Sequence, residues 1–175
     1  MTGTVLTLCG SLRADSSNRR LLRAAAALLP DDVSVDHFEG LAALPAFDPG
    51  LDDAPGPTVE DFRRRIKDAS AVLISTPEYA HGVPGALKNA LDWLVGSGEL
   101  IDKPVAVILA STSDGVFARQ ALVEVLRTMS AKVPDALTMS VGGIRSKVKM
   151  DGTLDGDLAV SMALITKNLL ASFRE

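Results

Sequence analysis

Short apolar runs alternate with longer segments of helical periodicity along the chain, and this alternation most restricts the possible folds. Strands are predicted over residues 4–9, 33–38, 71–75, 105–110 and 136–140, and helices over 17–29, 58–69, 84–95, 116–131 and 155–172. Strands that alternate with helices form parallel sheets through right-handed crossovers. We therefore expect residues 1–175 to form a single α/β domain of three layers, with a five-stranded parallel sheet and helices on both faces.

Three local expectations depend on this scheme. In the helix over 116–131, Phe117, Ala121 and Leu122 should point inward. The loop over 39–57 is rich in Pro, Gly and Asp, and its length suggests a functional excursion or a partner contact. Trp93 lies at the edge of an apolar helical stripe, so we interpret it as a core residue, with a subunit interface as the alternative.

Composition excludes several classes of protein. Hydrophobic residues make up 47% and charged residues 23%, which is too apolar for a disordered chain. The net charge of -4 does not favour nucleic acid as a partner. The basic run Arg63-Arg64-Arg65 is interpreted as a solvated helix face, with a phosphate-binding patch as the alternative. No apolar run reaches the ~20 residues of a membrane span, so no membrane partner is expected.

Cysteine and histidine usage points to a cytoplasmic protein without a metal site. Cys9 is the single cysteine, so no intrachain disulfide can form, as is usual in a reducing compartment. No secretory signal is recognisable near the first residues. The two histidines, His37 and His81, lack the spacing of metal ligands. His37 is expected to be structural or solvated, and His81 is a candidate for lining a ligand site.

The ligand site is expected at the carboxyl ends of the strands. In an open parallel sheet, ligands bind where the strand order reverses. For the order 2-1-3-4-5, this switch point lies between the first and third strands. The loops after the first, third and fourth strands should therefore build the site.

The first of these loops, residues 10–18, reads GSLRADSSN and ends at the start of a helix. Free backbone N–H groups and the helix dipole favour an anion there. Ser11, Ser16, Ser17 and Asn18 add polar groups that can bind phosphate oxygens, and Arg13 adds a positive charge. The pattern is neither a Walker A loop nor the dinucleotide GxGxxG motif. An ordinary capped turn is the alternative.

The second loop, residues 76–84, reads TPEYAHGVP and is shaped by two prolines and a glycine. Such a loop can present backbone groups to the edge of a flat heterocycle. Tyr79 can supply an aromatic surface, Glu78 can accept a hydrogen bond, and Gly82 can adopt positive φ. A structural turn with a solvated glutamate is the alternative. The third loop begins at Ser111, is small and polar, and would close the far side of the ligand site.

The segments GSLRADSSN and TPEYAHGVPGALKNALDWL together resemble the NADPH-dependent FMN reductase family, which includes quinone, chromate and azo-dye reductases. This resemblance covers nearly the whole chain. It implies a flavodoxin-like fold, bound FMN, NADPH or NADH as electron donor, and a homodimer or homotetramer. The implied small-molecule electron acceptor is a quinone, an azo compound, a metal oxyanion or a free flavin. Many members have Asn where this chain has Ala80.

In the family, the first loop holds the FMN phosphate and the second borders the isoalloxazine ring. The resulting cofactor-binding candidates are Ser11, Arg13, Ser16, Ser17, Asn18, Pro77, Glu78, Tyr79, Ala80, His81, Gly82 and Ser111. Arg13, Arg145 and Lys147 are candidates for meeting a 2′-phosphate. No side chain is assigned as a catalytic acid or base. An electron carrier without its own NAD(P)H site, and a binding module that has lost the cofactor, are the alternative functions.

Overall fold

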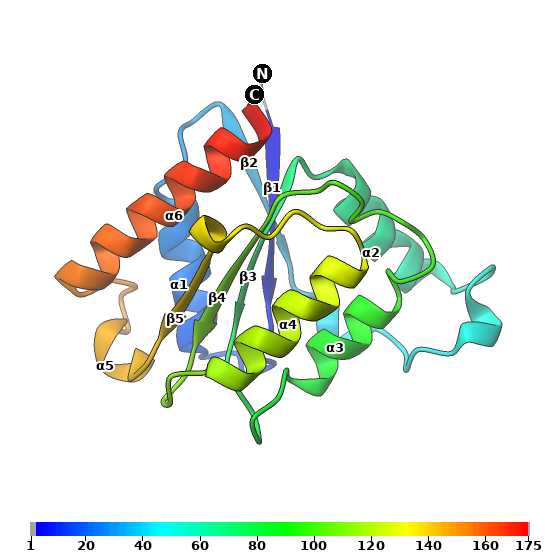
Figure 1. The fold of residues 1–175 in the computed structure, drawn as a ribbon, viewed down its shortest axis with the longest axis horizontal. Coiled ribbons are helices and arrows are strands. Elements are labelled where there is room, and N and C mark those ends of the chain that lie inside the picture. The colour runs from blue at the N-terminus through cyan, green and yellow to red at the C-terminus, as the bar shows by residue number, and fades with distance from the viewer. Residues whose placement is uncertain (1–2, 175) are drawn as a thin grey trace.

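The computed structural model describes residues 3–174, which form a five-stranded sheet between two layers of helices (Figure 1). The strands are β1 (Gly3–Cys9), β2 (Val33–Phe38), β3 (Ala71–Thr76), β4 (Val105–Ala110) and β5 (Thr138–Val141). They are hydrogen-bonded in the order β2-β1-β3-β4-β5, and each neighbouring pair runs parallel. This confirms the predicted α/β fold class and the 2-1-3-4-5 order.

Helices pack on both faces because the strands are apolar on both faces. In β3, Val72 and Ile74 pack with one group of helices, whereas Leu73 packs with the other. Successive strand residues point to opposite faces, so one strand supplies both cores. The first group is α2 (Pro57–Asp68), α3 (Gly85–Asp92) and α4 (Val116–Thr128); the second is α1 (Ser17–Ala26) and α6 (Gly156–Arg174) (Figure 1). No helix within residues 3–174 has the length and apolarity of a bilayer span.

Several element boundaries differ from the sequence prediction. α1 ends at Ala26 instead of residue 29, which leaves Leu28 exposed beyond the helix. β5 begins at Thr138 instead of residue 136, because Asp135–Leu137 forms a 3₁₀ turn. A short helix that the sequence did not predict, α5 (Ile144–Lys147), follows β5. The 3₁₀ turn and α5 have three and four residues, too few for a pattern of apolar residues to identify them.

The inward face of α4 also differs from the prediction. Its buried residues Ala118, Leu122 and Leu126 are spaced four apart and form one stripe. Leu122 is therefore inward as expected, but Phe117 is 55% exposed and Ala121 lies at the surface. The prediction for Phe117 and Ala121 was wrong because the next residue in each case, Ala118 or Leu122, lies on the buried stripe instead.

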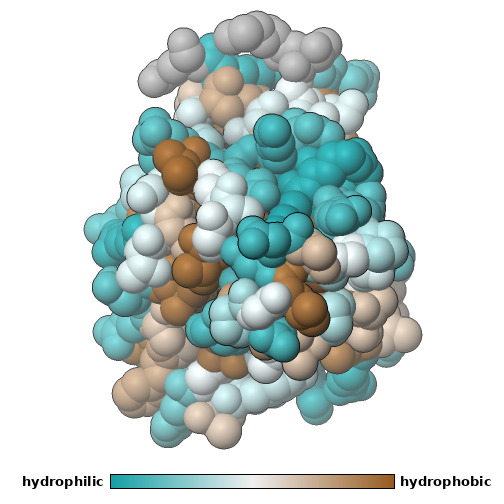
Figure 2. Space-filling model, turned by 90° about the vertical axis from the view of Figure 1, so that its right-hand side faces the viewer, coloured by the Kyte–Doolittle hydropathy of each residue, from teal (hydrophilic) through white to brown (hydrophobic). Residues whose placement is uncertain are grey.

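The segment over residues 39–57 packs against the molecule. The Pro45 carbonyl accepts hydrogen bonds from Trp93 Nε1 at 2.9 Å and from Asn89 Nδ2 at 2.8 Å. The Phe47 ring meets Trp93 edge-on, with centroids 5.0 Å apart. Trp93 is fully buried, as the core interpretation predicted. On this side of the molecule, apolar residues form separate patches among hydrophilic ones (Figure 2).

The basic run on α2 is only partly a solvated face. Arg64 is exposed, but Arg63 donates to the Trp93 carbonyl at 2.9 Å and pairs with Asp52. Arg65 pairs with Asp36, and this contact lowers the pKa of the Asp36 carboxyl. The interpretation as a solvated face therefore holds for Arg64 and is wrong for its two neighbours, which fix α2 to the adjoining loop and strand.

Candidate functional site

A cavity of about 490 Å³ lies at the carboxyl ends of β1, β3 and β4, at the lower edge of the sheet in Figure 1. β1 lies between β2 and β3, so this edge contains the switch point where open parallel sheets bind ligands. Predicted site residues that line the cavity are Ser11, Arg13, Ser16, Ser17, Asn18, Pro77, Glu78, Tyr79 and Ser111. The two sequence motifs thus meet at one cavity.

One end of the cavity is the N-terminus of α1. Ser16 is the N-cap, and its Oγ accepts a hydrogen bond from Asn18 N at 3.2 Å. Ser17 Oγ accepts from Arg20 Nη2 at 3.2 Å, and Ser11 Oγ accepts from Arg13 N at 3.4 Å. The first turn of α1 carries no acidic residue. Its remaining backbone N–H groups and positive dipole end are therefore available to an anion.

Asn18 joins the start of α1 to the ends of two strands. Its buried side chain donates from Nδ2 to the Ala110 carbonyl at 3.0 Å and accepts at Oδ1 from Ser75 Oγ at 2.7 Å. A primary amide has two N–H donors, so one donor remains for a ligand. The main effect of this side chain is to fix the helix terminus over β3 and β4.

Gly10 lets the loops after β1 and β3 approach each other. Its N–H donates to the Ser75 carbonyl at 2.9 Å. A Cβ atom at Gly10 would lie 2.1 Å from Thr76 Oγ1, closer than any real contact. Close packing at the carboxyl ends of β1 and β3, where the cavity lies, thus requires a glycine at this position.

The other end of the cavity is bordered by Pro77, Glu78 and Tyr79, and Tyr79 begins a tight turn that ends at Gly82. Tyr79 N donates to the Gly82 carbonyl at 3.0 Å, and Gly82 N donates to the Tyr79 carbonyl at 2.9 Å. The central residues Ala80 and His81 have φ of 49° and 60°. Two positive φ values are the signature of a type I′ turn, which favours Asn and Gly. Gly82 does not use the positive φ that a glycine can adopt, because the turn places positive φ on the two preceding residues.

Glu78 connects this loop to α4. Its Oε2 accepts from Ala118 N at 2.9 Å, and its Oε1 accepts from Ser113 Oγ at 3.3 Å. The N-cap of α4 is Gly115, which has no side chain to satisfy the first N–H groups. Glu78 caps the helix instead, and a carboxylate is favoured at that position by the helix dipole. Its carboxylate is thus engaged, unlike the solvated glutamate of the alternative interpretation.

The tip of the turn lies beside the cavity. Within the described part of the chain, Ala80, His81 and Gly82 are not among the residues that line it. The exposed His81 ring stacks on Phe117 of α4, with centroids 4.5 Å apart and planes inclined by 26°. Tyr79 stands at the rim and is 52% exposed.

Sequence reasoning missed part of the cavity wall. Arg20 contributes from α1, and Ile144 and Met150 contribute from the segment after β5. Of the two other cations considered, Arg145 lines the cavity, while Lys147 is not in its lining as described. The sequence held a signal for each part of this wall. Arg20 follows Ser17 by three residues, so the two share a helix face. The strands β4 and β5 are parallel, so the segment after β5 leaves the sheet at the same edge as the loop after β4.

Cys9 and His37 lie outside the cavity lining. The buried Cys9 thiol donates to the Ser11 carbonyl at 3.4 Å, and burial raises its pKa. His37 Nδ1 lies 2.7 Å from Thr7 Oγ1, and partial burial lowers the pKa of the imidazole. Across residues 3–174 no cluster of His, Cys, Asp and Glu has the geometry of a metal site.

The sheet order and the position of the cavity define a flavodoxin-like protein, a class that holds flavin mononucleotide at this switch point. The profile of the family described as NADPH-dependent FMN reductase matches residues 4–145. The chain therefore belongs to this family and is an NAD(P)H-dependent oxidoreductase with FMN as its cofactor.

Individual relatives agree with this assignment. A quinone reductase of Escherichia coli K12 is 35% identical over 153 residues, which cover 82% of this chain and 80% of that protein. A 2-hydroxy-1,4-benzoquinone reductase of Burkholderia is 43% identical over 89 residues, covering 51% of this chain and 48% of that protein. The structure of FerB, a flavoenzyme NAD(P)H:(acceptor) oxidoreductase from Paracoccus denitrificans, superposes with a TM-score of 0.87 at 25% identity, covering 98% and 97% of the two chains.

Proposed function

We propose that this chain is a quinone reductase whose FMN lies in the 490 Å³ cavity, with the phosphate at the N-terminus of α1 and the ring beside Pro77, Glu78 and Tyr79. The observation that carries the proposal is the joining of an anion-binding helix terminus and a proline-stiffened loop in one cavity. A cavity of about 300–1,000 Å³ is usual for a cofactor-sized ligand.

The phosphate would be bound by serine hydroxyls, backbone N–H groups and arginine. Ser11, Ser16 and Ser17 supply hydroxyls, Arg13 supplies positive charge, and Arg20, which is paired with Asp15, supplies further N–H donors. Hydrogen bonds between charged partners are about twice as strong as neutral ones. The phosphate end therefore orients the flavin more than the ring end does. Asn18 holds the start of α1 in place before the ligand binds.

The ring end would leave one side of the flavin open. Bound FMN supplies the redox chemistry, and the protein binds it, orients it and controls access. Glu78 is occupied in capping α4, so its carboxylate positions the loop. The half-exposed Tyr79 offers an aromatic surface for the nicotinamide or for a flat acceptor. No acid or base from the protein is required, and Ala80, His81 and Gly82 shape the rim.

Quinones are the proposed acceptor class because they are flat, and because the relatives that match 82% of this chain are quinone reductases. Azo compounds, metal oxyanions and free flavins are the further acceptors to test. NADPH and NADH are both proposed as donors. Arg145, at the cavity wall, is the candidate contact for a 2′-phosphate.

Assembly, domain count and location are part of the proposal. His81 and Phe117 form an exposed stacked pair, and the half-exposed Tyr79 begins the same turn beside the cavity, which suits the interface of a homodimer or homotetramer. The two hydrophobic clusters flank one sheet, which supports a single domain over residues 1–175. The single, buried cysteine suits a reducing, cytoplasmic setting.

Anaerobic reduction tests the function. Purified protein loaded with FMN is mixed with NADPH or NADH alone, and the flavin absorption band is followed. Direct bleaching, then recovery on adding a quinone, is the expected result. An electron carrier would keep its colour until a separate reductase is added. A module without cofactor would bind no FMN, and either outcome would refute the proposed function.

A further inference from the structure

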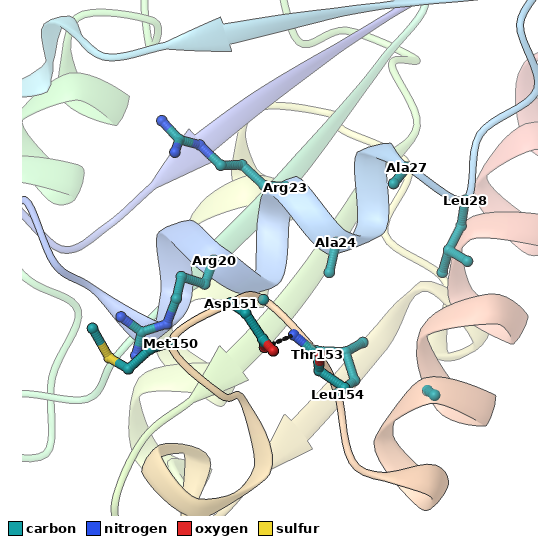
Figure 3. A pocket seen from close by; sticks show the side chains of 11 residues that line it. Arg20, Arg23, Ala24, Ala27, Leu28, Met150, Asp151, Thr153 and Leu154 are labelled. Atoms are coloured by element: carbon teal, nitrogen blue, oxygen red, sulfur yellow. Dashed lines mark hydrogen bonds between the residues drawn. The ribbon is translucent and has the colours of Figure 1, made fainter.

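A second cavity, of about 620 Å³, lies along α1 next to the first (Figure 3). α1 forms one wall, and the 150–154 segment with the start of α6 forms the other. Arg20 and Met150 line both cavities, so the two meet at these side chains. The junction lies on the side of the first cavity where α1 begins, which is the proposed phosphate end.

The lining of the second cavity changes in character along its length. Near the junction stands the Arg20 guanidinium. Ala24 on α1 and Ala27 at its C-cap have small side chains that leave a shallow surface opposite the apolar side chain of Leu154. Asp151 supplies a carboxylate on the same opposite wall. Small side chains between larger apolar ones suit a flat group lying on the helix.

Arg20 has unused binding capacity at the junction. Its Nη1 pairs with Asp15, and its Nη2 donates to Ser17 Oγ at 3.2 Å. A guanidinium has five N–H donors, so these two contacts leave donors on Nη1 and Nη2 for an anion. Arg23 also lines the second cavity, but its side chain extends away from the 150–154 segment in Figure 3 and its Nη2 lies 3.7 Å from Glu39 Oε1. Arg20 is therefore the cation of the junction.

Asp151 is suited to hydroxyl groups and unsuited to phosphate. Its Oδ1 accepts from Thr153 N at 2.9 Å, and this hydrogen bond lowers the pKa of the carboxyl. An ionised carboxylate accepts hydrogen bonds and donates none. Carboxylates use this property to bind the ribose 2′-hydroxyl in dinucleotide sites, and the same charge repels a 2′-phosphate.

Phosphate at Arg20, a ribose diol at Asp151 and a flat base over Ala24 and Ala27 describe an adenosine 5′-phosphate group. We propose that the second cavity is an adenosine subsite of the flavin site, so that the chain binds flavin adenine dinucleotide (FAD) as well as FMN. This inference rests on the proposed position of the FMN phosphate at the N-terminus of α1. The adenosine half of FAD continues from that phosphate, whereas the adenosine of a nicotinamide cofactor would have to pass it against like charge.

The test compares two methionine substitutions on α1. Ala24→Met fills the second cavity, whereas Ala26→Met places the same side chain on the same helix outside both cavities. Flavin-stripped full-length protein is titrated calorimetrically with FMN and with FAD. The wild type should bind FAD at least as tightly as FMN. Ala24→Met should weaken FAD binding by about tenfold or more and leave FMN binding unchanged, and Ala26→Met should change neither.

Three outcomes would overturn the inference. FAD binding that is insensitive to Ala24→Met, with FMN binding intact, refutes the subsite and leaves the proposed function standing. A rise in the KM for NADH in FMN-loaded Ala24→Met, with FAD affinity unchanged, assigns the cavity to the nicotinamide cofactor. Absence of FMN binding in the wild type refutes the proposed function itself, and the subsite with it.

Discussion

The two ends of the candidate site are built in opposite ways. At the end proposed for the phosphate (the phosphate end), the buried Asn18 amide ties α1 to two strands, and Gly10 fits tightly against Thr76. At the end proposed for the flavin ring (the ring end), a tight turn carries positive φ at Ala80 and His81 beside the half-exposed Tyr79. An anion is best held by donors that are fixed before binding. Residues in rare backbone conformations are common at functional sites, and Ala80 and His81 are two such residues beside the end proposed to exchange substrates.

The largest expected effect is at the phosphate end. Gly10→Ala would place a Cβ atom 2.1 Å from Thr76 Oγ1, between two strands that cannot easily separate. We expect a loss of about 3 kcal/mol in the free energy of unfolding, together with loss of FMN. Urea denaturation and flavin content measure both. Gly85→Ala is the control, because a Cβ atom at Gly85 meets nothing within 4 Å. Equal stability of the two variants would show that the loops after β1 and β3 are not closely packed.

Removing the Asn18 side chain should have the next largest effect. Asn18→Ala deprives Ser75 and the Ala110 carbonyl of partners in a buried setting, which costs about 2 kcal/mol of stability. Asn168→Ala is the control, since that amide donates to the Ala136 carbonyl at an exposed position. If thermal unfolding shows the same loss in both variants, the phosphate end is not the fixed end of the site.

Arg13→Ala should separate binding from stability. Arg13 is exposed and makes no ion pair with residues 3–174, so the free energy of unfolding should stay unchanged. FMN affinity should fall by about 1.5 kcal/mol, roughly tenfold, through loss of one charge-assisted contact. Fluorescence titration with FMN measures the change, and Arg64→Ala serves as a control for net charge. Unchanged affinity would remove Arg13 from the site.

The smallest expected effect is at the ring end and has the opposite sign. Ala80→Gly relieves a non-glycine residue at φ of 49°, so we expect the protein to be stabilised by about 1 kcal/mol. FMN affinity should change little, because Ala80 is not in the cavity lining of the described residues. Denaturant unfolding and FMN titration measure the two quantities. Destabilisation by Ala80→Gly would show that the turn is not strained and would weaken the contrast between the ends.

The sheet and the two site loops could be predicted because their signals are local. Apolar strands such as residues 105–110, and the start of a helix at Ser17, depend on neighbours in sequence. The strand order and the switch point follow from general rules of parallel sheets. These rules fix which strand ends meet, so the residues of the loops after β1, β3 and β4 were found together at one cavity.

The remaining features depend on contacts between distant residues. The capping of α4 by Glu78 joins two loops, and no local period records it. Met150 reaches the cavity because α5 turns the chain back after β5, and four helical residues are too few to predict. The positive φ of Ala80 and His81 is set by the hydrogen-bonded pair of Tyr79 and Gly82, while the sequence drew attention to the glycine alone.

A crystal structure of the chain with bound FMN tests the central claim most directly. The account predicts the phosphate within hydrogen-bond distance of the Ser16 and Ser17 side of the cavity, and the flavin ring against Pro77 and Tyr79. A flavin bound with its phosphate at the Tyr79 end, or bound outside this cavity, would contradict it.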